Sequence, residues 1–450
     1  MELSEVKKYL ENYRAVHKKM DVGRNYYNGV HDILKKKRLA IGENGELVEL
    51  TNLPNLRFVD NQYAKLADQK KNYILSLPPT IKSSDSAYQK LIEDIFNLRF
   101  LRTLNKIALD VFNCSIGWLY VYMDKGEFKY KKLNPREITP VWEDEEREKL
   151  KAVIREYVTG KMKHLDVYTE EGVYRYSAEL TALDYKFTEQ VGYLQDDNEV
   201  FSYGKIPFVY FKVNNDDGIL LDKVKSLQDG INSILFIFGD RVTEDTRDTV
   251  LVLKNYDGTN LDEFRRNLNQ YGAIKVQSYD GASGGGVETL NITVNHENYN
   301  IILQLLKQKL IENGRGIDTK NDKTTQAPNE LNIKGMYSDI ELDTNDIELE
   351  FSASFEYLQY FIKKIYKIPE SLTAQIQFKR NIMVNNESVV DILLKSQSML
   401  SQKTILAKHP YVNSVSEELA NLKSEVDGAI EFDMFGDRAD EEKAQREINS

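Results

Sequence analysis

The stretch between Ile206 and Gly314 constrains the fold of this 450-residue chain more than any other part. It holds two long runs with helical apolar periodicity, the first ending near Asp245 and the second spanning His296–Asn313. A short segment with mixed strand and helix patterns separates them. Such an insert can project away from the body of a protein and has few ways to reach a central active site. The arrangement indicates a part of an assembly.

The insert between the two helices has a local pattern of its own. Val250–Leu253 is rich in β-forming residues, and Leu261–Tyr271 places four large apolar side chains on one helical face. Ala273–Gln277 and Val287–Val294 alternate as strands do. The run between these two segments contains four glycines, which suit a mobile tip. We therefore expect a small α/β subdomain.

Each of the two long helices carries an apolar stripe that it cannot bury alone. The first stripe consists of Leu220, Leu221, Val224, Leu227, Ile231, Ile234, Leu235 and Phe238. Charged residues occupy other positions of that helix, namely Asp222, Lys223, Lys225, Asp229 and Asp240. The second stripe consists of Ile301, Ile302, Leu305, Leu306, Leu310 and Ile311. The stripes need each other, the body of the protein, or a neighbouring copy.

The first half of the chain changes from helical to strand periodicity. The predicted helices cover Leu3–Met20, Tyr26–Arg38, Asn61–Leu77 and, as a pair, Ser86–Asn113. Short alternating segments between turns then predict an antiparallel sheet. The predicted strands are Gly117–Met123, Phe128–Leu133, Ile138–Trp142, Lys151–Thr159, Lys163–Thr169, Gly172–Ser177, Ala182–Phe187 and Phe208–Val213. The predicted fold class is α+β.

The second half returns to helices. A long polar stretch precedes a predicted helix over Met336–Tyr366, which is acidic in its first part and aromatic in its last. We expect the aromatic part in the core. Gln375–Met383 has a strand pattern, and Asn385–Lys408 has the pattern of two helices. Glu417–Ser450 contains eleven acidic and four basic residues, which predicts a partly ordered tail.

Short segments along nearly the whole chain resemble one known family. They are Tyr26–Gly29, Asn61–Lys70, Asn72–Leu75, Pro78, Ile206–Phe208, Asn214–Asn215, Val252–Gly258, Ile274–Val276, Gln402–Thr404 and His409–Val412. Taken in this order, they are similar to the portal, or head-to-tail connector, family of tailed bacteriophages. None of these segments is catalytic, so the resemblance rests on their order along the chain.

The resemblance implies a portal fold with a wing, a two-helix stem, a small α/β clip, a long tunnel helix and a helical crown. The wing would be residues 1–218, helical first and then antiparallel strands. The other parts would be 219–248 and 295–314 as stem helices, 249–294 as the clip, 315–335 as the tunnel loop, 336–383 as the long helix with a wing strand, and 384–450 as the crown and acidic tail.

The resemblance also implies a function without catalysis. The chain would form a ring of about twelve copies, whose cyclic symmetry makes every interface heterologous. That ring would assemble in the host cytoplasm, occupy one capsid vertex of the virion and conduct double-stranded DNA during packaging and ejection. Its partners would be the large terminase motor, the major capsid and scaffolding proteins, and a head-completion or adaptor protein.

Three groups of candidate site residues follow from the resemblance. The tunnel loop would bring to the DNA Asp318, Lys320, Asn321, Asp322, Lys323 and Thr324. The acidic part of the long helix would place toward the bore Asp339, Glu341 and Asp343. The clip would dock partner proteins with Tyr256, Asp257, Arg265, Arg266, Tyr279 and Asp280.

Charge and composition restrict the function further. The net charge of -11 argues against tight, charge-driven binding of nucleic acid, because that affinity comes from Lys and Arg displacing phosphate counterions. An acidic lumen would keep a duplex off its wall, although mild acidity is also common among soluble proteins. The single cysteine, Cys114, lies in an apolar run and predicts a buried, inert thiol. The first residues lack the apolar core of a secretory signal, and no window has the about 18 uncharged apolar residues of a membrane helix.

The sequence contains no motif that identifies catalysis or metal binding. The Gly-rich run at 281–286 lacks the lysine of a phosphate-binding loop, and Asn214–Gly218 lacks calcium ligands at the required positions. Five histidines are scattered without ligand spacing, so no cofactor or metal is expected. Two alternatives stay open. One is an enzyme with an unrecognised hydrolytic site in the sheet-rich region, at His164 or Asp166, and the other is a scaffold or interaction module without a channel.

Overall fold

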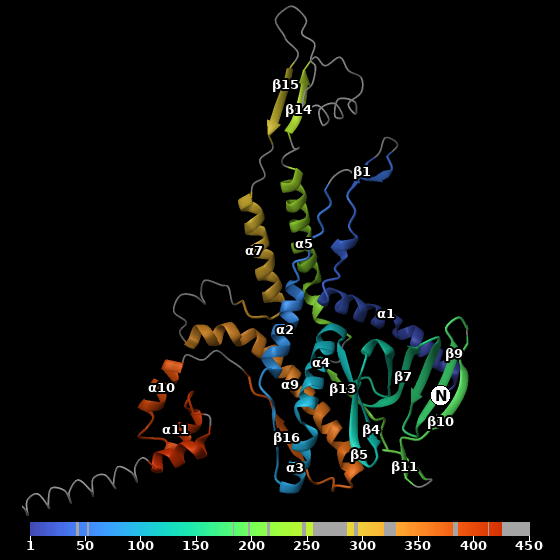
Figure 1. Cartoon of the computed structure of the whole chain (residues 1–450), viewed down its shortest axis with the longest axis vertical. Coiled ribbons are helices and arrows are strands. Elements are labelled where there is room, and N and C mark those ends of the chain that lie inside the picture. Colours follow the sequence, from blue (N-terminus) through green and yellow to red (C-terminus); the bar gives the residue numbers. More distant parts are fainter. Residues whose placement is uncertain are drawn as a thin grey trace, which may run out of the picture. The chain divides into compact units, whose positions relative to one another are not determined.

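The computed structural model combines helices with antiparallel sheets over most of the chain (Figure 1). The described residues are 1–41, 45–51, 54–182, 184–196, 199–213, 217–244, 249–254, 286–291, 296–318, 330–380, 386–412 and 414–424. They fall into two compact units. Unit 1 comprises Met1–Ile317 with Asp339–Asn381, and unit 2 comprises Asp318–Ser338 with Ile382–Ser450. The predicted α+β class is confirmed.

Four helices form the first part of unit 1. They are α1 (Leu3–Tyr27), α2 (Gln62–Leu75), α3 (Ser86–Ile95) and α4 (Leu98–Cys114). The side chains of Asn61, Asp85 and Asn97 accept hydrogen bonds from backbone N–H groups in the first turns of α2, α3 and α4. These caps fix where the predicted helices begin.

The predicted short helix over Tyr26–Arg38 is wrong. Helix α1 continues through Tyr27, and the segment after it contains only a 3-10 turn, η1 (Asp32–Lys35). The break falls at Gly29, whose φ of +82° lies in the left-handed region and interrupts a right-handed helix. The spacing of apolar residues does not reveal this turn.

Two antiparallel sheets form the strand-rich part of unit 1. Their strands are β4 (Ile116–Asp124), β5 (Glu127–Leu133), β6 (Ile138–Trp142), β7 (Leu150–Thr159), β8 (Met162–Tyr168), β9 (Val173–Glu179), β10 (Lys186–Val191) and β13 (Phe208–Lys212), with the 3-10 turn η2 (Pro135–Glu137) before β6. The five-stranded sheet has the order β10-β9-β8-β7-β6, and the three-stranded sheet has the order β13-β4-β5. Seven of the eight predicted strands lie within two residues of these bounds.

One predicted strand is misplaced. Strand β10 begins at Lys186, so the predicted strand over Ala182–Phe187 starts too early. The backbone N–H of Ala182 instead donates a hydrogen bond to the carbonyl of Glu179 in the turn after β9. This turn shifts the last strand of the sheet toward the C-terminus.

Besides one ladder in the insert between the two long helices, three small ladders complete the sheets of the described residues. They pair β1 (Leu39–Ile41) with β2 (Leu47–Glu49), β11 (Leu194–Asp196) with β12 (Glu199–Phe201), and β3 (Thr80–Ser83) with β16 (Ala374–Gln377). Only β16 was predicted, and it is shorter than the predicted Gln375–Met383 because its partner β3 offers four residues.

The two long helices lie where periodicity predicts them, as α5 (Leu220–Glu244) and α7 (His296–Asn313). Between them, β14 (Thr249–Lys254) pairs antiparallel with β15 (Gly286–Asn291). The predicted helix of the insert and the strand over Ala273–Gln277 lie outside the described residues.

The later helices differ from prediction mainly at one boundary. Helix α9 (Glu330–Tyr366) starts before Met336, so residues 330–335, expected in a loop, are helical. Unit 2 contains the predicted helix pair as α10 (Asn386–Lys395) and α11 (Gln402–Lys408). Among the described helices, none is long and apolar enough to cross a membrane.

Three apolar clusters hold unit 1 together. The largest joins α2, α4, the three-stranded sheet and the aromatic part of α9, where Phe355 and Phe361 are fully buried as expected. The second lies between the two sheets around Trp118 and includes Cys114, whose thiol pKa burial raises to about 12. The third packs the start of α1, at Val6, on the five-stranded sheet. The sheet-rich region therefore has an apolar core.

Candidate functional site

Helices α5 and α7 pack against each other in opposite directions. Gly230 lies against Leu306, so that a Cβ atom at Gly230 would be 3.6 Å from the Leu306 side chain. Farther along α5, the rings of Phe238 and Tyr299 have their centroids 5.3 Å apart. The two apolar stripes predicted from the sequence therefore meet, at least in part, within one chain.

A second face of α5 carries buried polar side chains that bind the backbone before and at the start of α2. Gln228 accepts a hydrogen bond from the backbone N–H of Tyr63 at 2.9 Å and donates to the carbonyl of Asp60 at 2.8 Å. One helical turn later, the Asn232 side-chain oxygen accepts from the backbone N–H of Asp60 at 3.1 Å. Both amides are fully buried. They satisfy backbone groups that would otherwise be buried without partners.

Asp240 extends this row of polar side chains by two further turns of α5. It is only 4% exposed and accepts a hydrogen bond from the backbone N–H of Leu56 at 2.8 Å. Arg38 lies 3.6 Å from the same carboxylate. Because spacings of four residues return to the same helix face, Gln228, Asn232 and Asp240 form one polar stripe along α5.

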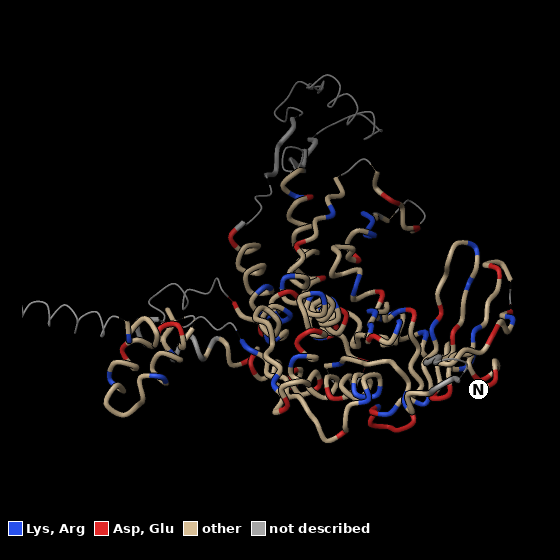
Figure 2. The backbone as a smooth tube through the Cα atoms, turned by 60° about the horizontal axis from the view of Figure 1, so that its bottom comes forward, with Lys and Arg blue, Asp and Glu red and all other residues tan. Residues whose placement is uncertain are grey.

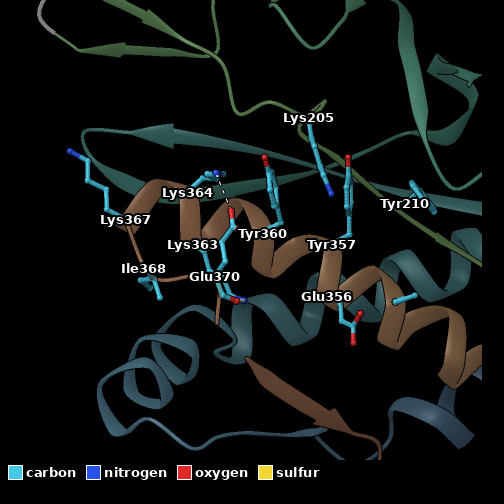
Figure 3. Close-up of a pocket in the computed structure, with 11 residues that line it drawn as sticks. Lys205, Tyr210, Glu356, Tyr357, Tyr360, Lys363, Lys364, Lys367, Ile368 and Glu370 are labelled. Carbon is cyan, nitrogen blue, oxygen red and sulfur yellow. Dashed lines mark hydrogen bonds and ion pairs between the residues drawn. The ribbon is translucent and has the colours of Figure 1, made fainter. Parts of the chain in front are cut away.

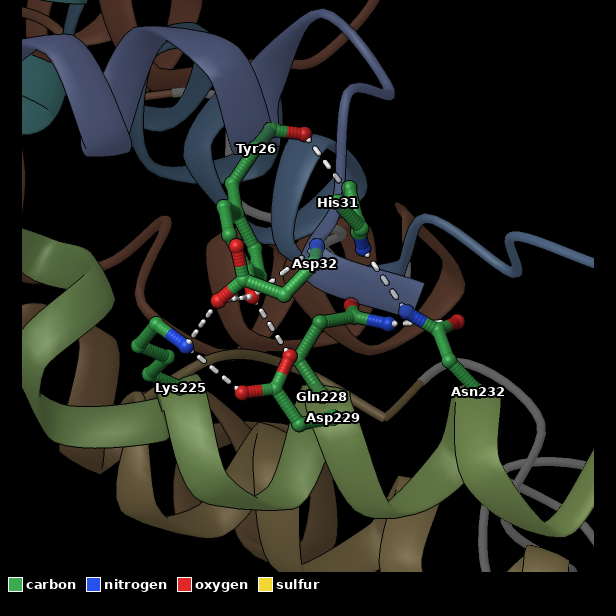
Figure 4. A network of polar contacts seen from close by, with 7 residues as sticks. All are labelled: Tyr26, His31, Asp32, Lys225, Gln228, Asp229 and Asn232. Carbon is green, nitrogen blue, oxygen red and sulfur yellow. Dashed lines mark hydrogen bonds and ion pairs between the residues drawn. The ribbon is translucent and has the colours of Figure 1, made fainter. Parts of the chain in front are cut away.

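The N-terminal half of α5 also carries a charged cluster that joins it to the end of α1 (Figure 4). The Lys225 ammonium lies 2.8 Å from Asp32 and 2.7 Å from Asp229. The Tyr26 hydroxyl lies 2.6 Å from the Asp229 carboxylate and 2.9 Å from that of Asp32. The hydrogen bond to Lys225 lowers the pKa of Asp32, and burial followed by the bond to Asp229 raises the pKa of Tyr26. Asp32 is therefore ionised, and the Tyr26 phenol is neutral.

His31 completes this network in a neutral form. Its Nδ1 lies 2.8 Å from the Asn232 amide nitrogen, and its Nε2 lies 2.9 Å from the carbonyl of Tyr26. The Asn232 oxygen is already used by the backbone N–H of Asp60, so the amide nitrogen must donate to His31. A proton on Nδ1 would place two donors face to face. Burial accordingly lowers the pKa of His31.

The C-terminal end of α7 is closed by a Schellman turn. Directly after this turn, the side chain of Gln69 binds the backbone of Ile317, a contact called the clamp below. The backbone N–H of Gly316 donates to Ile311 and that of Arg315 to Glu312, with Arg315 in the left-handed region at a φ of 50°. A Cβ atom at Gly316 would lie 2.6 Å from the Leu66 side chain. A residue larger than glycine at this position would therefore have to displace the Leu66 side chain.

Helix α2 holds the residues that follow the turn. The Gln69 side chain donates to the carbonyl of Ile317 at 2.8 Å and accepts from its backbone N–H at 2.8 Å. Residues 315–317, expected at the start of a loop, are thus fixed to α2. Two hydrogen bonds to the backbone of one residue set both the position and the orientation of the chain where unit 1 ends.

A buried ion pair lies beside this clamp. Lys70 is only 2% exposed, and its ammonium lies 2.6 Å from one carboxylate oxygen of Asp343. Arg315 and Lys223 lie 3.5 and 3.6 Å from the other oxygen of that carboxylate. Burial alone would raise the pKa of Asp343, but the three cations, Lys70 first, hold it below its ordinary value. Burial lowers the pKa of Lys70. The pair joins α2, α5 and α9 where α7 ends.

Large apolar side chains remain exposed on the long helices of this single chain. On α7, Ile301 is 57% and Leu305 51% exposed, and both belong to the predicted stripe. On α9, Leu342 and Leu349 are exposed at a spacing of seven residues, which places them on one face. Apolar side chains aligned along helices are typical of interfaces with other protein surfaces.

The two residues of the hydrolytic alternative lie in a charge ladder across the five-stranded sheet. Arg155 and Arg175 flank Asp166 in register from β7 and β9, and they also pair with Glu137 and Glu189. The Tyr157 hydroxyl donates to Asp166 at 3.2 Å. Figure 2 shows acidic and basic residues interspersed around this sheet. Burial raises the pKa of Asp166, but its neighbours use the carboxylate for cross-strand contacts.

His164 does not form an acid–base pair with that carboxylate. Its ring stacks on Tyr157 with the centroids 5.0 Å apart. Within the described ranges, no three His, Cys, Asp or Glu side chains are grouped so that they could hold a metal ion. The geometry here supports a sheet stabilised by charge pairs.

The three predicted site residues on α9 lie in three different environments. Asp339 is exposed on α9, Glu341 is paired with Arg380, and Asp343 is buried in the ion pair with Lys70. Asp318 is the one tunnel-loop candidate that belongs to the described residues. The candidates outside the described residues are Lys320, Asn321, Asp322, Lys323, Thr324, Tyr256, Asp257, Arg265, Arg266, Tyr279 and Asp280.

Sequence reasoning missed the residues that anchor the helix pair. The row formed by Gln228, Asn232 and Asp240 has helical spacing and could have been found as a polar stripe beside the apolar one. Gln69 and Lys70 gave no comparable signal, because their partners lie more than 240 positions away in the sequence.

Comparisons with known proteins give one consistent result. Residues 6–431 match the family model described as "Phage portal protein, SPP1 Gp6-like". A portal protein of Clostridium phage phiCD119 is 27% identical over 436 residues, which cover 93% of this chain and 94% of that protein. A portal protein of Bacillus phage SPP1 is 25% identical over 440 residues, which cover 93% of this chain and 86% of that protein. A solved structure described as the neck of an empty GTA particle computed with C6 symmetry aligns over 77% of this chain and 88% of that chain, with a TM-score of 0.46 and 9% identity.

Proposed function

Because the chain belongs to the phage portal protein family, SPP1 Gp6-like, we propose that it closes into a ring of about twelve copies at one capsid vertex. Double-stranded DNA passes through the centre of this ring during packaging and ejection. The ring is the docking platform for the packaging motor, for capsid and scaffolding proteins, and for head-completion proteins. It assembles in the host cytoplasm and stays in the virion.

One observation carries this proposal beyond family membership. Helix α7 is anchored at its end by the clamp at Gln69, yet it leaves Ile301 and Leu305 uncovered in the single chain. Burying one such side chain contributes about 2 kcal/mol. A neighbouring copy in a ring would cover these side chains, and cyclic symmetry would repeat the contact at every interface.

The parts of the chain then receive proposed roles. Residues 1–218 with the strand after α9 form the wing, 219–248 and 295–314 the stem, 249–294 the clip, and 384–450 the crown and tail. Residues 315–329 form the tunnel loop, with its start fixed by α2, because residues 330–335 belong to α9. Asp339 is the proposed lumen acid on α9, whereas Asp343 acts as the buried partner of Lys70. The clip candidates named above dock the motor and adaptor.

No catalytic step is assigned to this chain. The named relatives are portal proteins, and the energy for DNA movement would come from a partner that hydrolyses ATP. The hydrolytic alternative loses its support at Asp166, because arginine and tyrosine side chains occupy that carboxylate.

The proposal is tested by imaging the purified protein in negative stain, together with light scattering after size exclusion. Rings with a central hole are expected. A single compact particle at every salt concentration, with and without partner proteins, would overturn the proposal.

A further inference from the structure

A groove on unit 1 gathers lysine side chains around the last turns of α9 (Figure 3). Its volume is about 710 Å³, which is within the usual range of small-molecule and peptide side-chain pockets. Four lysines line it, Lys205, Lys363, Lys364 and Lys367, against two carboxylates, Glu356 and Glu370. The lining charge is therefore +2 in a protein whose net charge is -11.

The lysines are only partly neutralised. Lys364 lies 3.3 Å from Glu370, and Lys363 donates to the backbone carbonyl of Glu370 at 3.2 Å. Lys205 and Lys367 form no ion pair within the described part of the chain. A groove whose lining carries more positive than negative charge attracts an anion.

Lys367 stands where a helix end favours glycine. Its φ is 53°, and the backbone N–H of Ile368 donates to Lys363 at 2.9 Å, which closes α9 in a Schellman turn. A non-glycine residue in this region is strained by about 1 kcal/mol. The lysine therefore occupies a position that its backbone does not favour, beside the groove.

The aromatic floor of the groove is not free for stacking. The Lys205 ammonium lies 4.5 Å from the ring centroid of Tyr360 and 5.2 Å from that of Tyr357, and Figure 3 shows it reaching toward both rings. The Tyr360 hydroxyl donates to the carbonyl of Tyr203 at 2.6 Å, and that of Tyr357 to the carbonyl of Ile206 at 3.2 Å. Ring faces and hydroxyls both have partners within the chain.

We propose that this lysine groove binds an acidic peptide segment of a partner protein. Single-stranded nucleic acid that binds such a surface uses aromatic faces for its bases and cations for its phosphates. Here Lys205 already covers the ring faces, and Glu356 and Glu370 would repel a continuous phosphate chain. Spaced carboxylates of a peptide can instead meet the lysines and avoid the two glutamates. The inference rests on the proposed portal role only in that such a ring docks partner proteins.

The test uses the purified full-length protein and a fluorescently labelled oligoglutamate peptide, with oligoglutamine and oligothymidylate of the same length as competing probes. Binding is followed by fluorescence anisotropy at low and high salt. The test variant is Lys205→Glu with Lys367→Glu. The control is Lys8→Glu with Lys161→Glu, which changes the net charge equally at two exposed lysines that do not line the groove.

The expected result is binding of oligoglutamate that weakens as the salt concentration rises. The affinity should fall about tenfold in the test variant, because two lysines that would pair with the peptide are replaced by glutamates that repel it. The control variant should bind as the unmodified protein does. Equal affinity of the two variants, no binding of oligoglutamate, or tighter binding of oligothymidylate at the same lysines would overturn the proposal. Ring formation is imaged separately on each variant, so loss of peptide binding in intact rings is distinguishable from failure of the portal role. Lys205→Met with Lys367→Met is a second variant in case charge reversal impairs folding, and it should weaken oligoglutamate binding in the same direction.

Discussion

At the scale of single residues, the N-terminal half of α5 is held in place by side-chain amides whose orientation is fixed by the backbone groups that they bind. Asn232 can satisfy both the Asp60 N–H and His31 only if the imidazole is neutral. Gln228 has the same rigidity, because its amide bonds two backbone groups. Protonation of His31 would therefore break the hydrogen bond that it accepts from Asn232.

Stability should depend on pH through this histidine. An unfolded His has a pKa of about 6.5, and burial lowers the pKa of His31 in the folded protein. Between these two values the unfolded state binds more protons, so the free energy of unfolding rises with pH across that window and is constant above it. The slope is at most about 1.4 kcal/mol per pH unit for one such group. Burial also lowers the pKa of His17, which adds a second contribution.

Urea denaturation from weakly acidic to neutral pH measures this dependence. His31→Gln should flatten the slope, because a group that binds a proton more tightly in the unfolded state is removed. His17→Gln should remove the other part. An unchanged slope in His31→Gln would show that the network tolerates the protonated ring.

The Schellman turn after α7 makes a second prediction at this scale. Gly316→Ala would bring a methyl group within 2.6 Å of Leu66 and 2.9 Å of the Gln69 oxygen, so the clamp on Ile317 must shift. We expect a loss of about 1–3 kcal/mol in the free energy of unfolding. The matched control is Gly335→Ala on α9, where a Cβ atom meets nothing within 4 Å. That change should stabilise the helix by up to about 1 kcal/mol. Equal effects of the two changes would contradict a tight turn.

At the scale of elements, α7 is anchored by its end and by one side, while its outer apolar residues stay uncovered. The partner of those residues is a surface outside the single chain if the protein forms rings. Stability of the chain and stability of the assembly should therefore be separable by substitution on this helix.

Leu305→Glu should reduce assembly without unfolding the chain. The side chain is 51% exposed, so a carboxylate there can remain hydrated in the monomer, but it would be buried against a neighbour. Light scattering should report a lower fraction of rings, and the thermal midpoint of the monomer should stay nearly unchanged. The control is Asn300→Glu at an exposed polar position of α7, which should assemble normally. Normal rings in Leu305→Glu would place the interface elsewhere.

At the scale of the whole molecule, the negative net charge, with acidic and basic residues interspersed along the backbone (Figure 2), opposes tight retention of DNA. The proposed lumen acid Asp339 belongs to this scale, because its effect requires the assembled ring. Its proposed role is to prevent phosphate contacts that would slow the duplex.

Asp339→Lys should convert that position into a phosphate contact. Assembled rings carrying this change should bind a short duplex more tightly at low salt, and the salt dependence of binding should become steeper. Electrophoretic mobility of the duplex, measured over a series of salt concentrations, checks this. Asp94→Lys makes the same change of charge on α3 and serves as the control. An equal gain in both variants would exclude a lumen position for Asp339.

The sequence alone determined the helix pair, the strand-rich region and the family, because apolar periodicity and the order of short segments are local properties of the chain. It also placed Phe355 and Phe361 in the core, since an aromatic stripe on a helix has few other uses. Only the tertiary structure decided which polar residues are buried. Asp343 belongs to a helix that looks acidic and exposed in sequence, yet Lys70 reaches it from α2 across 273 positions. Burial of a charge depends on which surface covers it, and that information lies in the packing of distant elements.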